Sequence, residues 1–137
     1  FGDRHSDVAQ SLSSLAGLYH GQGRSKEAEP LYVRALELRK SLFGDRHPDV
    51  AQTLNDLGDL HYSQGRYEKA EPLYVQALEL RKSLFGDRHP DVVQSLDNLA
   101  HLYARQGRFD KAELLYGQAL ELEKSLQGER HADVATS

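Results

Sequence analysis

Histidines are the residues of this chain that most readily suggest chemistry, because an imidazole can bind a metal ion or transfer a proton. Four of the seven recur every 42 residues, each directly after an arginine: His5, His47, His89 and His131. A ladder of metal ligands would need three or four side chains within a few ångströms of one ion. Successive repeat units should hold these four apart, so we expect each to cap or pack a loop before a helix.

The other chemistry-bearing residues are not arranged for catalysis. His20, His61 and His101 fall at three different repeat positions and form no matched ligand set. Ser, Asp and Glu are present, but composition without convergent geometry makes no triad. The glycine-containing stretch 21–24 joins two helical patterns and is not a strand-to-helix phosphate loop. With no Cys there is also no thiol nucleophile. The sequence predicts no enzyme, no metal site and no cofactor.

Composition and charge exclude several classes of partner. The chain has 137 residues and a formal net charge of −4, with no block of Lys and Arg, which argues against generic binding to nucleic acid or to an anionic membrane. No apolar run approaches the ~20 residues of a membrane-spanning helix. The absence of Cys is compatible with the cytosol, and we expect a cytoplasmic protein. Because the chain starts at Phe1 and contains no Met, we expect a fragment of a longer protein.

A repeat organises the whole chain. Three units occupy residues 1–42, 43–84 and 85–126, and a partial fourth unit occupies 127–137. Self-similarity at a fixed period of this length is typical of a solenoid, in which each unit packs only on its neighbours. We therefore expect a single domain over residues 1–137.

Each unit carries two helical patterns. In unit two, Val50, Leu54 and Leu57 begin an apolar stripe with helical spacing, and Gly58 and His61 continue it. The turn 64–66 then interrupts the pattern, with Gly65 suited to the left-handed residue that ends a helix. The second stripe is formed by Ala70, Leu73, Tyr74, Ala77 and Leu78, and it continues toward Gly86. Two helices joined by so short a turn must form an antiparallel hairpin.

Local signals agree with these boundaries. Pro48 and Pro90 fit the first turn of a helix, where the missing N–H has no intrahelical partner. Arg39 and Arg81 place positive charge near the end of the second helix, which suits the helix dipole. Pro30 and Pro72 lie about a turn inside the second helix, where we expect a local bend. Small residues at Ala16, Gly58 and Ala100 should let the helices approach opposite Tyr32, Tyr74 and Tyr116.

The pattern Leu54, Leu57-Gly58, Ala70, Tyr74 and Ala77, with its counterparts in the other units, resembles the tetratricopeptide repeat. The longer period resembles the subclass found in kinesin light chains. The resemblance implies an all-α fold: a right-handed α-solenoid of stacked antiparallel helix hairpins. Two positions depart from the pattern, because His61 replaces the tyrosine of the other units and Gln127 replaces their phenylalanine.

The resemblance also implies a binding surface, because the first helices of such arrays line a concave groove. The expected groove residues are Gln10, Ser13, His20, Gln52, Asn55, Asp56, Asp59, Tyr62, Gln94, Asp97, Asn98, His101 and Arg105. Most differences between units one and two fall in the first helix, which fits either functional tuning or drift on an exposed surface. The groove is polar and mildly acidic. Gln94 and Asn98 stand where chaperone-binding arrays carry cations for a C-terminal carboxylate, so that role is disfavoured. Their amides could hydrogen-bond an extended peptide.

The sequence thus predicts a non-catalytic protein-interaction module that binds a peptide or partner domain in the groove. The alternative is a structural spacer or a self-associating array in a larger signalling or regulatory protein, with an empty groove. Near-identical units also fit a consensus-designed array, although exchanges such as Leu114 for proline favour natural drift. We further expect head-to-tail association, because the face around Phe1 and the face with Leu122 and Leu126 are complementary halves of an internal contact.

Overall fold

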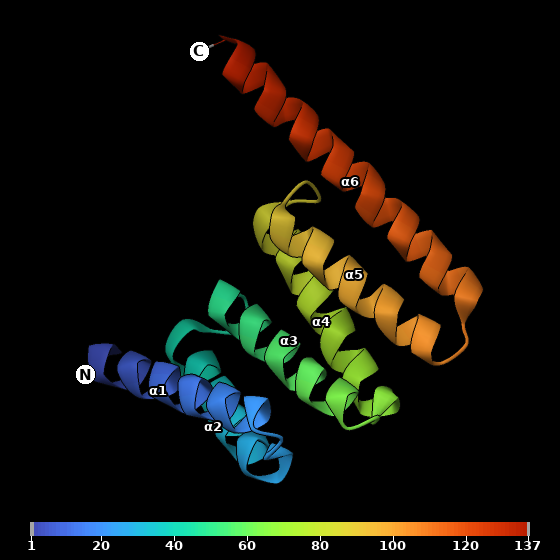
Figure 1. The fold of residues 1–137 in the computed structure, drawn as a ribbon. Helices are drawn as coiled ribbons and strands as arrows, with labels where there is room; N and C mark the ends of the chain where they lie inside the picture. The colour runs from blue at the N-terminus through green and yellow to red at the C-terminus, as the bar shows by residue number, and fades with distance from the viewer. Residues whose placement is uncertain (1, 137) are drawn as a thin grey trace.

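Six α-helices form three hairpins that stack in sequence order (Figure 1). The computed structural model describes residues 2–136. The helices are α1 (Gly2–Gly21), α2 (Ser25–Phe43), α3 (Pro48–Ser63), α4 (Tyr67–Phe85), α5 (Pro90–Arg105) and α6 (Phe109–Thr136). Within the hairpins α1 packs on α2, α3 on α4 and α5 on α6, and the hairpins meet through α2 with α3 and α4 with α5. The expected all-α solenoid of helix hairpins is confirmed.

An aromatic stack and a proline shape the loop between two units. The ring of His47 stacks on Phe43 with the centroids 4.2 Å apart, and its Nδ1 accepts a hydrogen bond from the N–H of Asp49 at 3.1 Å. Pro48 begins α3, where its missing N–H leaves no helical partner unsatisfied. The same arrangement recurs around His89. The expected capping role is therefore confirmed for these two histidines.

The outer two histidines of the ladder do not lie in loops. His5 lies inside α1 and His131 inside α6, contrary to expectation. A proline restrains the residue before it to extended backbone, and this restraint is missing where Ser6 and Ala132 replace it. Gln127 also replaces the phenylalanine that stacks on the histidine in the two complete loops. As a result α6 runs straight through the start of the partial fourth unit, and no separate fourth first helix folds back.

The two predicted stripes of unit two form its core. On α3 the side chains of Val50, Leu54 and Leu57 are buried, and on α4 those of Tyr74 and Leu78. They pack against apolar residues of the neighbouring units in three clusters. Each unit therefore completes its core only by stacking, as the repeat predicts.

Helix ends and interruptions also follow the sequence. Gly65 has a φ of 75° and Gly86 a φ of 82°, the left-handed region that L side chains disfavour. Pro30 lies inside α2 and Pro72 inside α4. Across residues 2–136, none of the helices has the length and apolar character that crossing a bilayer requires. The expected packing of Phe1 lies outside the described residues.

A close approach of α3 and α4 requires a glycine at position 58. A Cβ at Gly58 would lie 2.7 Å from two carbons of the Tyr74 ring, so the ring would have to move. We expect Gly58→Ala to lower the free energy of unfolding by about 1–3 kcal/mol, as measured by urea denaturation.

Gly17→Ala is the matched control, because a Cβ there meets only the Tyr32 hydroxyl at 3.5 Å, an ordinary contact. Alanine is the better helix former by ~1 kcal/mol, so this control should be neutral or stabilising. Equal destabilisation by both changes would contradict the close packing at Gly58.

Candidate functional site

The candidate site lies on the three first helices, α1, α3 and α5. We call the polar side chains that these helices carry outside their apolar stripes the first-helix face. All the expected groove residues are on it: Gln10, Ser13 and His20 on α1; Gln52, Asn55, Asp56, Asp59 and Tyr62 on α3; Gln94, Asp97, Asn98, His101 and Arg105 on α5. Their shared repeat positions place them side by side from unit to unit.

Hydrogen bonds join the three helices across this face. The amide of Asn98 donates to Oδ1 of Asn55 at 2.7 Å, from α5 to α3. Nε of Arg105 donates to the hydroxyl of Tyr62 at 3.2 Å, again from α5 to α3. His20 on α1 shares a hydrogen bond with a serine of α3, Nε2 to Oγ, at 3.2 Å. The first-helix face is therefore one connected surface across three units.

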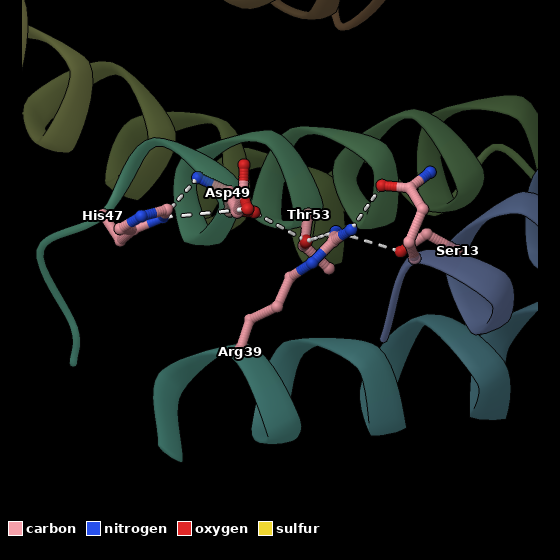
Figure 2. Close-up of polar contacts among 6 residues, drawn as sticks. Ser13, Arg39, His47, Asp49 and Thr53 are labelled. Atoms are coloured by element: carbon pink, nitrogen blue, oxygen red, sulfur yellow. Dashed lines mark hydrogen bonds and ion pairs between the residues drawn. The ribbon is translucent and has the colours of Figure 1, made fainter. Parts of the chain in front are cut away.

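Two buried arginines support the face from below. Arg39 reaches from α2 to Thr53 of the next unit at 2.8 Å and to Ser13 of its own unit at 3.0 Å, as Figure 2 shows. Its guanidinium also donates to Oε1 of Gln10 at 3.1 Å. Because its five donors form a rigid fork, an arginine can hold several acceptors in fixed positions at once. One side chain thus fixes polar groups of two consecutive first helices.

Arg81 repeats this arrangement between units two and three. It is 2% exposed and donates to Oε1 of Gln52, to Oε1 of Gln94 and to the hydroxyl of Ser95, each at 3.0 Å. Burial lowers the pKa of Arg81, while the nearby carboxylate of Asp91 acts in the opposite direction. These contacts orient the carbonyl ends of both glutamines inward. The glutamine side chains themselves remain exposed on the face.

The centre of the face holds two carboxyl groups with neutral partners. Asp59 accepts a hydrogen bond from the hydroxyl of Tyr74 at 2.5 Å, and Asp56 accepts one from the amide of Gln52 at 3.0 Å. Burial is the main cause that raises the pKa of both carboxyl groups above the ordinary value. Burial together with these two carboxylates raises the pKa of Tyr32 to about 12. This part of the face is acidic and partly shielded from water.

Asn55 does not lie open on the surface as expected. Its side chain is 3% exposed and is held between Asn98 and Asp59, so a peptide cannot reach it without breaking these bonds. The reason is the stacking of α5 on α3, which brings the two asparagines into contact. Asn55 therefore joins two units. Of the expected groove residues on α3 and α5, the exposed ones are Gln52, Gln94, His101 and Arg105.

The His20–Ser63 pair on this face is not arranged as a serine nucleophile with its base. The hydroxyl of Ser63 donates to the carbonyl oxygen of Leu60 at 2.7 Å, so it can only accept from His20. A serine nucleophile needs the opposite polarity, with its proton pointing at the imidazole. Among the residues whose side chains the structure describes, no three His, Cys, Asp or Glu lie close enough to hold a metal ion.

Comparison with known families decides what this arrangement is. The sequence model of the tetratricopeptide repeat matches residues 7–83 and 57–125. The chain belongs to the tetratricopeptide repeat family. A search of curated protein sequences gives no match.

Solved structures agree with this tetratricopeptide array. BtubC (BKLC) from P. vanneervenii is 32% identical with a TM-score of 0.83, and the match covers 88% of this chain and 48% of that one. A Podosopora anserina putative kinesin light chain with nearly identical repeats is 22% identical with a TM-score of 0.77, covering 88% and 56%. The second repeat domain of Spaghetti (RPAP3), bound to the HSP90 peptide SRMEEVD, is 17% identical with a TM-score of 0.64, covering 87% and 95%. The chain spans about half the length of the first two proteins. The kinesin-light-chain-like character predicted from the sequence is confirmed.

The buried arginines are the residues of the array that sequence reasoning missed. Arg39 and Arg81 were expected to interact with the helix dipole, whereas Lys40 and Lys82 are the cations in the last turns. One signal was available. The arginine recurs in two units and becomes Glu123 in the third, while the neighbouring lysine is kept in all three.

His61 replaces a tyrosine at the contact between units one and two. Its ring is buried, Nδ1 has no hydrogen-bond partner, and Nε2 lies 3.8 Å from a carboxylate oxygen of Glu29. Burial lowers the pKa of His61 below its ordinary value. The charge of Glu29 acts to raise this pKa, and the charges of Lys69 and Arg66 act to lower it. At the equivalent contact between units two and three, Tyr103 occupies this position.

This burial predicts a pH-dependent loss of stability. The unfolded chain binds a proton at His61 near pH ~6.5 and the folded chain only at lower pH, so stability falls as pH drops below ~6.5. We expect His61→Tyr to be more stable than the parent by a margin that grows between about pH 7.5 and about pH 5.5 in urea denaturation. Using the difference between the two proteins cancels the contributions of Asp56 and Asp59. A margin independent of pH would contradict the assignment to His61.

Proposed function

We propose that this tetratricopeptide array is a non-catalytic protein-interaction module that binds a peptide or partner segment across the first-helix face. The observation that carries the proposal is the support of that face from below. Arg81 fixes Gln52 and Gln94 through their carbonyl oxygens, and one amide N–H of Gln52 is taken by Asp56. The amide N–H groups of Gln94 and the second N–H of Gln52 are thereby held at the exposed surface. Such preorganised polar groups lower the entropic cost of binding an extended chain.

Two further observations support the proposal. The face spans three units that are joined by hydrogen bonds, so a bound segment would meet a rigid surface. A solved array with the same fold holds an HSP90 peptide, although that likeness extends to the fold alone. The acidic centre differs from a cationic carboxylate clamp, so we propose a partner without a terminal carboxylate anchor. We further propose a cytoplasmic protein that does not bind nucleic acid or membranes, as its charge and lack of Cys favour.

The test is a peptide selected from a random phage-displayed library on the immobilised chain, with affinity measured by calorimetry. The double variant Asp56→Ala, Arg105→Ala should lower the affinity for this peptide by about tenfold, because each side chain contributes roughly half of the corresponding binding free energy. The control is Glu79→Ala, Lys69→Ala, which removes one exposed acid and one exposed base from the second helix α4. Equal affinity for both double variants, or failure to select any peptide, would contradict the proposal.

A second candidate function is self-association, and the exposure of α1 favours it. Val8 is 47% exposed, whereas its counterpart Val50 is 1% exposed because α2 covers it. Leu18 on α1 is likewise exposed although its counterpart Leu60 is buried, and Leu120 on α6 is exposed although its counterpart Leu78 is buried. We propose that α1 of one copy stacks on α6 of another. Light scattering over a wide concentration range should then show a rising mass that Leu18→Glu abolishes. A constant monomer mass would rule this out.

A further inference from the structure

Unit three carries a negative residue, Glu123, at the repeat position where units one and two carry a buried arginine. In units one and two this position holds Arg39 and Arg81, which are buried and donate to the polar groups of two first helices. In unit three it holds Glu123, which is exposed. A carboxylate is an acceptor only and cannot replace the five donors of a guanidinium. Glu123 therefore offers Gln94 no equivalent of the hydrogen bonds by which Arg39 holds Gln10 and Arg81 holds Gln52 within their own units.

A hollow of about 470 Å³ lies beside this glutamate, between α5 and α6. Val93, Leu126 and Pro90 give it an apolar wall. Asp97 and Glu123 place two carboxylates in the same lining. The hollow therefore combines apolar surface with negative charge in one small space.

The negative charge in this hollow has no basic counterpart among the residues whose side chains the structure describes. None of its described lining residues is Lys or Arg, and neither Asp97 nor Glu123 has a side-chain hydrogen bond or ion pair with another described residue. This contrasts with Asp56 and Asp59, whose carboxylates accept hydrogen bonds from neighbouring side chains. Two unpaired carboxylates beside an apolar wall favour a group that carries a positive charge on an apolar stem.

We propose that this hollow binds an arginine or lysine side chain of the partner segment, with an apolar residue of the same segment against Val93 and Leu126. The inference rests on the proposed function and specifies the partner's chemistry: a basic residue next to an apolar one. A second copy of the chain fits less well. If α1 of a second copy packed on α6 as α5 packs on α4, it would bring Gln10, Ser11 and Ser14 to the hollow. None of these three side chains is a cation.

The test uses two small probes, N-acetyl-leucyl-arginine amide and its citrulline analogue, which has the same shape without the charge. Each is titrated into the chain and followed by heteronuclear NMR. The arginine probe should shift the backbone amides of Val93, Asp97 and Leu126 and bind at least about fivefold more tightly than the citrulline probe.

Two variants with the same change in charge distinguish an effect at the hollow from an effect of the protein's net charge. Glu123→Arg should weaken the arginine probe by about tenfold or more, because it places a cation in the hollow. Glu121→Arg makes the same charge change at an exposed residue of α6 that does not line the hollow, and should leave the affinity nearly unchanged. Equal effects of the two variants, or equal binding of the two probes, would overturn the inference.

The outcomes also separate this inference from the proposed function. If library-selected peptides bind through Asp56 and Arg105 but Glu123→Arg leaves the arginine probe unaffected, only the inference fails. If the arginine probe binds as expected but no peptide binds the first-helix face, the inference stands as a subsite and the proposed function fails. If Glu123→Arg instead abolishes a concentration-dependent increase in mass and the probe does not bind, a second copy occupies the hollow and the inference is overturned.

Discussion

Leu57→Ala is expected to lower the free energy of unfolding by about 2–5 kcal/mol, the loss typical of a fully buried leucine. Leu57 is 4% exposed and packs in a cluster with Ala16, Tyr32 and Leu60, which belong to units one and two. Truncation therefore leaves a cavity at the contact between units. Leu15 holds the equivalent position on α1 but is 39% exposed, so Leu15→Ala should cost markedly less.

Chemical denaturation of both variants, followed by circular dichroism, measures the difference. The two changes remove the same atoms from the same repeat position, so local helix propensity cancels between them. Equal losses would mean that stacking on the preceding hairpin does not complete the core of a unit.

Arg81→Glu is expected to lower the free energy of unfolding by about 3–5 kcal/mol, because it buries a charge without a partner. The new carboxylate would face Oε1 of Gln52, Oε1 of Gln94 and the carbonyl of Asp91, all of which are acceptors. It would also lie near Asp56, whose charge already acts on Arg81.

Glu123→Arg is the reciprocal control, since it makes the opposite exchange at the same repeat position of unit three. Glu123 is exposed, so the change should alter stability by less than about 0.5 kcal/mol. Comparable losses for the two exchanges in urea denaturation would show that the burial of Arg81 does not support the array.

Much of the fold could be predicted because the repeat presents each signal more than once. The stripes of Val50 and Leu54 on α3 and of Tyr74 on α4 follow helical spacing, and both are buried as expected. Gly65 indicates a turn because glycine adopts the positive φ found there more easily than residues with a side chain. Such features depend on neighbours along the chain, so the sequence alone reveals them.

The remaining features depend on contacts between units, which no local pattern encodes. Asn55 has the spacing of an exposed residue, yet the stacking of α5 buries it against Asn98. Arg81 lies next to Lys82 near the end of α4, where a solvated cation is expected, yet its guanidinium donates to side chains of two first helices. The continuation of α6 past residue 126 results from substitutions in one loop. An expectation based on the repeat assumes that this loop has the same structure in every unit.

Mapping a bound peptide is the most direct test of whether a partner segment binds across the first-helix face. The library-selected peptide is titrated into the isotopically labelled chain, and backbone amide shifts are assigned to the six helices. We expect the shifts to concentrate on α1, α3 and α5, around Gln52, Asp56 and Arg105. Shifts confined to the exposed sides of α2, α4 and α6 would contradict it.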